Sequence, residues 1–275
     1  MDPTHLHQIA VEAMRARGLL PAFAPQALQE AEDARLAAPE RNGAIRDLRH
    51  LTWFSIDNDD TRDLDQLSVA ELLPAGSTRL LVAVADVDAM VRPGGAVDGH
   101  AGANTTSVYT AAGVFPILPE ALSNDLTSLH EDQERLAVVV DMQVETDGTV
   151  SASASSVYRG LVLNRAKLTY DGVSAWLDGL APVLPQIASV QELEDQLRLH
   201  DALAGQLRQW RQTRGALNIN TVSARPVFQD GQLVDLRPDN KNRAKDLIAG
   251  LMIAANGATA RFMVDQGFPS LRRLL

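Results

Sequence analysis

The sequence predicts an α+β fold, in which helices pack on a mixed, mostly antiparallel sheet and a small helical unit precedes it. Three observations indicate this fold. Apolar residues recur at helical spacing near the N-terminus and again in the second half of the chain. Apolar and β-branched runs bounded by Gly, Pro or Asp lie between them. Two Asp-Gly pairs, at 147–148 and 230–231, each separate two such runs, which is typical of a hairpin.

Helical spacing first covers residues 5–17 and 25–38, so residues 1–45 are predicted to form a small helical N-terminal region. Two short helices joined by a turn form either a helix-turn-helix that binds nucleic acid or an arm that only packs, and the spacing does not separate these alternatives. Longer helices are predicted at residues 190–214 and about 242–266.

The predicted strands belong to the region from residue 46 to the end of the chain. They cover residues 52–56, 67–73, 80–85, 136–145, 150–163, 224–228 and 232–236. The run from Leu80 to Ala85 is continuously apolar rather than alternating. This pattern predicts a strand that is buried on both faces.

The composition excludes several classes of protein. With 275 residues, 45% hydrophobic and 22% charged, the chain is long and apolar enough to fold around a core. No apolar run approaches the ~18–20 residues that cross a bilayer, and the N-terminus lacks a signal-peptide pattern, so we expect a cytoplasmic protein without a membrane partner. The absence of cysteine excludes disulfide partners, thiol nucleophiles and cysteine zinc sites.

The charge is unevenly distributed along the chain. The net charge of −10 divides into −13 over residues 51–150 and +4 over residues 151–275, with −1 before them. An acidic middle followed by an Arg-rich end suggests that a cluster of carboxylates lies next to an anion-binding surface. A merely uneven surface charge is the equal alternative.

The acidic middle concentrates at residues 57–65, which hold five aspartates directly after a predicted strand. Like charges at this density repel and raise one another's pKa, so a folded chain keeps them in water or neutralises them with a cation. Short carboxylate side chains suit Mg²⁺, which leaves room for phosphate oxygens. An EF-hand starting at Asp57 is excluded, because Arg62 and Ser68 occupy the positions that need Gly and Glu. The remaining alternatives are a catalytic metal site, a non-catalytic cation site such as a calcium-stabilised binding module, and a solvated acidic loop.

A series of motifs narrows these alternatives. They are Ser55–Asp57, Asp63–Asp65, Val82–Val87, Thr106–Tyr109 and Phe115–Leu129. In this order and spacing they resemble the catalytic domain of the ribonuclease II/ribonuclease R (RNB) exoribonucleases. Weaker similarity continues through Leu168–Tyr170 and the helix after Lys241. Residues 46–275 are therefore expected to be the N-terminal and central part of an RNB-like catalytic domain.

The resemblance implies a magnesium-dependent hydrolytic 3′→5′ exoribonuclease, with Mn²⁺ as a second usable ion. Such an enzyme acts processively on single-stranded RNA from its 3′ end and releases nucleoside 5′-monophosphates. By similarity Asp57, Asp63 and Asp65 are the catalytic, metal-binding carboxylates, with Asp65 at the family's most activity-critical position. The fourth acidic position holds Gln66, whose amide oxygen ligates a hard cation without adding charge. A catalytically weakened or inactive RNA-binding or regulatory protein is therefore the alternative.

The resemblance also implies RNA contacts. Tyr109 matches the family tyrosine that stacks near the 3′ end of the RNA. The basic charge of the C-terminal third, rather than the resemblance, makes Arg214 and Arg225 candidate RNA-binding residues, and a solvated surface charge is the alternative for each. The motifs of residues 116–129 are expected to shape the wall of the pocket rather than to do chemistry. The family's essential arginine and S1-like barrel lie beyond the matched segments, and the sequence ends at Leu275 before either. We therefore expect a fragment of a longer chain that is not fully active alone, and its oligomeric state is not indicated.

Overall fold

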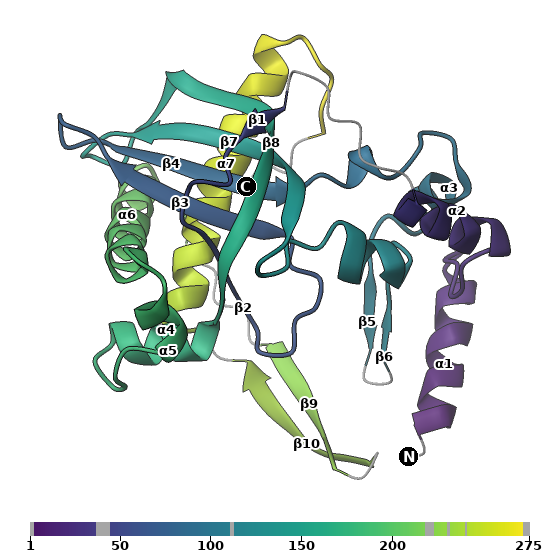
Figure 1. The fold of residues 1–275 in the computed structure, drawn as a ribbon. Coiled ribbons are helices and arrows are strands. Elements are labelled where there is room, and N and C mark those ends of the chain that lie inside the picture. The colour runs from purple at the N-terminus through teal and green to yellow at the C-terminus, as the bar shows by residue number, and fades with distance from the viewer. Residues whose placement is uncertain are drawn as a thin grey trace. The chain divides into compact units, whose positions relative to one another are not determined.

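The computed structural model of the chain describes residues 3–36, 45–110, 113–217, 223–229, 232–239 and 241–271. Its contacts divide the chain into two compact units. The smaller unit combines Met1–Glu40, Val87–Thr127 and Ile219–Asn240. The second unit, here called the barrel unit, combines Arg41–Asp86, Ser128–Asn218 and Lys241–Leu275. Figure 1 shows their elements.

The barrel unit is built on one six-stranded sheet with the strand order β1-β8-β2-β3-β4-β7. Its strands are β1 (Arg46–Asp47), β2 (Trp53–Asp57), β3 (Gln66–Leu72), β4 (Thr78–Ala85), β7 (Glu134–Val144) and β8 (Val150–Thr169). Only the pairings of β8 with β1 and β2 are parallel. The prediction of helices packed on a mixed, mostly antiparallel sheet is confirmed. Because β8 also pairs with β7, the sheet closes into a barrel, which the sequence did not indicate.

Strand β8 closes the barrel because it pairs with β7 along its first part and with β2 along its last part. Its first part pairs antiparallel with β7, from Val150 opposite Val144 to Leu163 opposite Glu134. Its last residues run parallel to β2 and end with Thr169 beside Asp57. The sequence predicts this strand only as far as residue 163, and Arg165 and Lys167 follow in the part that was not predicted. Those two polar residues alternate with the buried Ala166 and Leu168, so the strand continues with one polar face.

The β7–β8 hairpin at Asp147-Gly148 is confirmed. Gly148 has a φ of +86°, in the left-handed region that favours glycine. A Cβ atom at this position would lie 2.5 Å from the backbone oxygen of Gln206, so the turn also needs glycine to pack on the neighbouring helix. The second predicted hairpin is confirmed as β9 (Ser223–Gln229) paired with β10 (Gln232–Asp239) in the smaller unit. Its turn, residues 230–231, lies outside the described residues.

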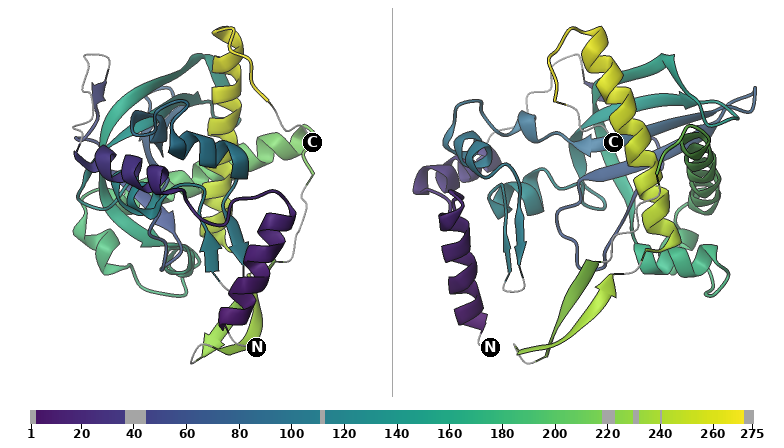
Figure 2. Two further views of the ribbon diagram at one scale, coloured as in Figure 1. Left: turned by 90° about the vertical axis from the view of Figure 1, so that its right-hand side faces the viewer. Right: turned by 180° about the vertical axis from the view of Figure 1, so that it is seen from behind.

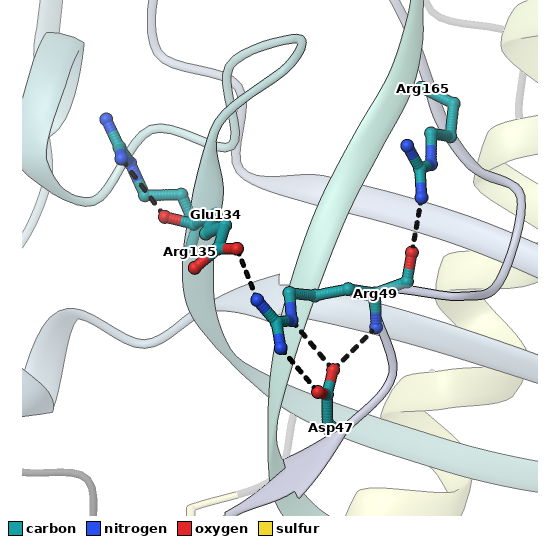
Figure 3. Close-up of polar contacts among 5 residues, drawn as sticks. All are labelled: Asp47, Arg49, Glu134, Arg135 and Arg165. Atoms are coloured by element: carbon teal, nitrogen blue, oxygen red, sulfur yellow. Dashed lines mark hydrogen bonds and ion pairs between the residues drawn. The ribbon is translucent and has the colours of Figure 1, made fainter.

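A polar network fastens the chain where the barrel closes (Figure 3). The Arg49 guanidinium donates to both carboxylate oxygens of Asp47, at 2.9 and 2.6 Å, and also pairs with Glu134 of β7. From β8, Arg165 Nη2 donates to the Arg49 backbone oxygen at 2.7 Å. The bidentate pair with Arg49 lowers the pKa of Asp47 far below its usual range. These contacts join the β1 end of the sheet to β7 and β8.

The two faces of the sheet are both buried, as the continuous apolar run of β4 predicted. Leu80 and Val82 belong to the cluster under the helices, whereas Leu81 and Ala83 belong to a second cluster, here called the barrel cluster. Full burial of a Leu or Val side chain contributes about 1.5–3 kcal/mol. The covering helices are α4 (Tyr170–Leu177), α5 (Pro185–Ser189), α6 (Leu193–Thr213) and α7 (Arg243–Asp265), with α6 and α7 side by side (Figure 2). The helices predicted at 190–214 and about 242–266 are thus confirmed.

Helix α7 is long and apolar enough to cross a membrane by length and composition, with a mean hydropathy of 1.5 over its most apolar window. The expectation that no apolar run approaches that length was therefore wrong for this helix. Leu247, Leu251, Ala255 and Ala258 are buried in the cluster under the helices. The apolar residues of α7 thus form part of the hydrophobic core.

The smaller unit holds both helices predicted near the N-terminus. Its elements are α1 (Pro3–Ala16), α2 (Pro25–Leu36), a 3₁₀ turn (Val87–Ala89), α3 (Ala96–Asn104), β5 (Val108–Thr110), β6 (Gly113–Phe115) and a π-helical turn (Leu122–Leu126), besides β9 and β10. Ala27 and Ala31 of α2 pack with Val97 of α3. The Glu30 carboxylate accepts hydrogen bonds from the first backbone N–H groups of α3, at 2.8 and 3.1 Å, which lowers its pKa. Helix α2 therefore has a packing role.

Candidate active site

The predicted aspartates lie at one end of the barrel. Asp57 is the last residue of β2, and Asp65 directly precedes β3. The two strands pair antiparallel at Phe54 and Ser68, so the end of β2 at Asp57 and the start of β3 after Asp65 lie at the same end of the sheet. The side chains of Asp57, Asp63 and Asp65 are called the carboxylate edge below.

The neighbouring carboxylates affect the ionisation of Asp65. Asp65 is solvent-accessible, yet enough protein surrounds it that desolvation is the main cause raising its pKa. The negative charges of Asp57 and Asp63 raise it further. Tyr170, the first residue of α4, has its pKa raised to about 12 by burial and by the charges of Asp57 and Asp65. The structure therefore brings together the three carboxylates that the sequence predicted.

The carboxylate edge has no basic partner in the part of the chain that the structure describes. No Lys or Arg described there forms an ion pair with an aspartate of residues 57–65. Other carboxylates of the barrel unit are paired: Asp86 with Arg159 at 2.8 Å, Asp141 with Arg79 at 2.7 Å and Asp201 with Arg243 at 2.6 Å. Negative charge that no described ion pair neutralises attracts a cation.

The aspartate oxygens of the carboxylate edge suit a magnesium ion that takes only some of its ligands from the protein. Among the described residues, no three His, Asp or Glu side chains converge closely enough to hold a metal ion alone. Mg²⁺ commonly binds through one or two carboxylates and completes its octahedron with water and substrate phosphates. One oxygen of Asp57 accepts from the Asn58 N–H at 2.6 Å and the Thr61 hydroxyl at 2.7 Å, and these bonds orient its carboxylate. The edge therefore fits an ion completed by water and phosphate.

Gln66 occupies a different environment from the aspartates. It is the first residue of β3 and 7% exposed, and its Nε2 lies 3.4 Å from the Ile56 backbone oxygen, a long hydrogen bond. Because strand side chains alternate, Gln66 points away from the face that carries Asp65. Its role as a metal ligand stays a prediction.

The candidate RNA-binding residues are dispersed in the fold. Tyr109 lies on β5 of the smaller unit and is 73% exposed, as a stacking surface requires. Arg225 lies on β9, and its side chain is outside the described part of the chain. Neither residue is in the barrel unit, and their roles stay predictions.

Arg214 follows α6 and lies far from the carboxylate edge. Its guanidinium stacks over the Trp210 ring at 4.0 Å, and both line a cavity of about 320 Å³ with Asp147 of the β7–β8 turn. The first residue of β4, Thr78, pairs with Val144 near this turn, whereas the N–H of its last residue, Ala85, donates to the backbone oxygen of Asp65. The length of β4 between them is roughly 23 Å. An RNA contact of Arg214 would therefore lie outside the carboxylate edge.

Two residues near the edge, Tyr170 and Lys167, are not predicted from the sequence. Tyr170 belongs to a weak motif that implies no role for it, and no motif includes Lys167. The Lys167 ammonium donates to the backbone oxygens of Asp59 at 3.2 Å and Thr61 at 2.6 Å. Both residues lie more than 100 positions from Asp57 along the chain, and only the β2–β8 pairing brings them close. Nothing local in the sequence could have indicated this.

Comparisons with known proteins agree with this architecture. The RNB domain model matches residues 45–275. Ribonuclease R of Escherichia coli is 34% identical over 259 residues, which are 93% of this chain and 31% of that protein. The structure of Mycoplasma genitalium RNase R in complex with ribose methylated single-stranded RNA superposes with a TM-score of 0.84 at 23% identity, over 95% of this chain and 40% of that one.

The same fold also occurs in yeast Ssd1, described as a pseudonuclease, with a TM-score of 0.61 at 15% identity over 81% of this chain and 26% of that one. The chain spans about a third of the length of the curated relatives it matches. The matched model covers most of the chain, from the strands that build the barrel to helix α7. The chain therefore belongs to the RNB domain family.

Proposed function

We propose that this chain carries the carboxylates of a magnesium-dependent, hydrolytic 3′→5′ exoribonuclease that acts processively on single-stranded RNA. The observation that carries the proposal is the carboxylate edge. Its three aspartates lie close enough to raise the pKa of Asp65, and no described basic side chain pairs with them. Membership of the RNB family supplies the substrate class.

Asp57, Asp63 and Asp65 would hold the divalent cation, Mg²⁺ or Mn²⁺. When bound, such an ion activates water and neutralises charge on the scissile phosphate. Water adds to phosphorus and the P–O3′ bond breaks, so the shortened RNA keeps its 3′ hydroxyl after taking a proton. The released nucleotide leaves with the phosphate on its 5′ oxygen. This balance accounts for nucleoside 5′-monophosphates as the product.

Tyr109 would stack on a base near the 3′ end. Its 73% exposure leaves a ring face open to a ligand, and base stacking on an aromatic ring contributes about 1–3 kcal/mol. Arg214 and Arg225 would contact phosphates elsewhere along the RNA. Such contacts select single-stranded RNA without selecting its sequence.

A second candidate function is RNA binding without efficient cleavage. It is favoured by Gln66, because this position adds no charge to the edge and its amide lies beside the Ile56 carbonyl. A second metal ion would then depend on substrate phosphate to complete its coordination. The two functions make opposite predictions for RNA shortening.

The test is a denaturing gel of 5′-labelled single-stranded RNA incubated with the intact chain in Mg²⁺, in EDTA and with Asp65→Asn. Because the proposed exoribonuclease acts processively, it converts the labelled RNA in Mg²⁺ to short end fragments with few intermediates, and it loses at least about 100-fold in rate in the other two arms. Intact RNA in every arm, with a gel shift that survives EDTA, would overturn the proposal and establish the binding protein.

A further inference from the structure

The loop that carries the aspartates is fastened to the barrel by two side chains outside it. Both come from segments distant in sequence, Ser128 just before β7 and Lys167 on β8. Neither side chain contacts a carboxylate of the edge by a described hydrogen bond or ion pair. Both contact the loop's backbone.

Ser128 fixes the backbone on both sides of Asp63. Its hydroxyl accepts from the Leu64 N–H at 2.9 Å and donates to the Arg62 carbonyl at 2.9 Å. The Leu129 N–H donates to the Leu64 carbonyl at 2.8 Å, so both backbone groups of Leu64 are held. The Leu64 side chain is 2% exposed within the barrel cluster. With Leu64 fixed, the side chains of Asp63 and Asp65 stay on the solvent-accessible surface.

Lys167 holds the other half of the loop. Its ammonium donates to the carbonyls of Asp59 and Thr61, and the Thr61 hydroxyl in turn donates to Asp57 at 2.7 Å. The backbone N–H of Lys167 donates to Glu131, at 3.1 Å. Because the positive charge is engaged by carbonyl oxygens, the carboxylates remain available to a metal ion.

Repulsion among five aspartates favours opening of a free loop, and a metal ion would then have to bring the carboxylates together. Groups that hold the loop in advance remove this cost, because a preorganised site loses less freedom on binding. We infer that Ser128 and Lys167 are positioning residues for the divalent cation, an inference that rests on the proposed function of the carboxylate edge. Such supporting contacts typically contribute about 10–100-fold in metal affinity.

The test measures Mn²⁺ binding to the intact chain by electron paramagnetic resonance, without RNA. The variants are Ser128→Ala and Lys167→Met, with Lys167→Arg to retain charge and donors. Ser174→Ala is the matched control, because the Ser174 hydroxyl is also buried in the barrel unit and accepts a backbone N–H, that of Ala244, at 2.9 Å. Thermal melts of each variant measure the structural cost separately.

We expect Ser128→Ala and Lys167→Met to raise the Mn²⁺ dissociation constant by about 10-fold or more. Lys167→Arg recovers part of the loss, and Ser174→Ala lowers the melting temperature without changing the dissociation constant. A dissociation constant for Ser128→Ala and Lys167→Met within twofold of the unaltered chain would overturn the inference and leave the proposed function intact. An unaltered chain that binds no Mn²⁺ would overturn both.

Discussion

At the residue scale, Asp65 shows a conflict between stability and function. Burial and two neighbouring carboxylates disfavour its charged form, although a metal site needs that form. The same residue therefore costs stability while the site is empty of cation and supports binding when a cation is present. A structural carboxylate such as Asp201 is paired with Arg243 instead.

The pH dependence of stability tests this conflict. Because the folded state raises the pKa of Asp65 above the unfolded value of about 3.9, the folded chain binds the proton more tightly. The contribution of Asp65 to stability is thus complete below the unfolded pKa and is lost as pH rises through the raised one. In EDTA at neutral pH, Asp65→Asn is expected to melt at a higher temperature than the unaltered chain. Thermal melts from pH 4 to 7 would contradict this if the two curves stay parallel.

Gln66 provides a second prediction at this scale. A carboxylate introduced at this buried position would face the Ile56 carbonyl in place of an amide donor. Gln66→Asp is therefore expected to lower the free energy of unfolding in EDTA by about 1–3 kcal/mol relative to Gln66→Leu, which introduces no charge. Urea unfolding measures both variants. Equal stability of the two would show that the position has access to water or to a donor.

At the element scale, local patterns were sufficient for the long elements and insufficient for the closure of the barrel. Helices α6 and α7 and the two hairpins follow from periodicity and Asp-Gly turns. The last six residues of β8 are not predicted, because their alternation of polar and apolar residues is short and their partner β2 lies about a hundred residues earlier. Helix α4 starts at Tyr170 directly after that strand, with only the Thr169 side chain as a cap, so no Gly or Pro marks the boundary.

The glycine of the β7–β8 turn is predicted to be more costly to replace than a glycine in open space. Gly148 combines a positive φ with contact to α6, whereas Gly179 has a φ of +71° and nothing within 4 Å of a Cβ. Gly179→Ala is expected to cost about 1–2 kcal/mol for the left-handed conformation alone. Gly148→Ala adds a steric clash worth about 1–3 kcal/mol more. Urea unfolding measures both variants. If Gly148→Ala and Gly179→Ala lower the free energy of unfolding by the same amount, the hairpin can move away from α6 at no cost in stability.

At the scale of the whole molecule, the sequence predicted the chemistry of the site better than its supports. Asp57, Asp63 and Asp65 lie within nine residues, so their proximity is local. Ser128 and Lys167 reach the same loop only through the folded barrel. The smaller unit is likewise assembled from three separated segments, one of which is the predicted N-terminal helical region, and no local pattern reveals such an assembly.

The charge of the whole chain predicts how RNA binding responds to salt. With a net charge of −10, the chain repels RNA overall, so binding depends on local basic surfaces. If Arg214 and Arg225 each neutralise one phosphate, each substitution by Ala is expected to reduce the slope of log affinity against log salt by about 0.7. Fluorescence anisotropy with labelled single-stranded RNA between low and moderate salt measures this slope. An unchanged slope for either variant would remove that arginine from the RNA path.

In the proposed mechanism, a cation held by the carboxylate edge contacts the scissile phosphate. The most direct measurement replaces a non-bridging oxygen of the 3′-terminal linkage by sulfur and compares rates of nucleotide release by the intact chain in Mg²⁺ and Mn²⁺. Since Mn²⁺ accepts sulfur better than Mg²⁺ does, we predict that one stereoisomer is cut slowly in Mg²⁺ and that Mn²⁺ restores its rate. Cleavage that persists in EDTA, or that is equally fast for both stereoisomers with either ion, would show that no cation of the carboxylate edge contacts this phosphate.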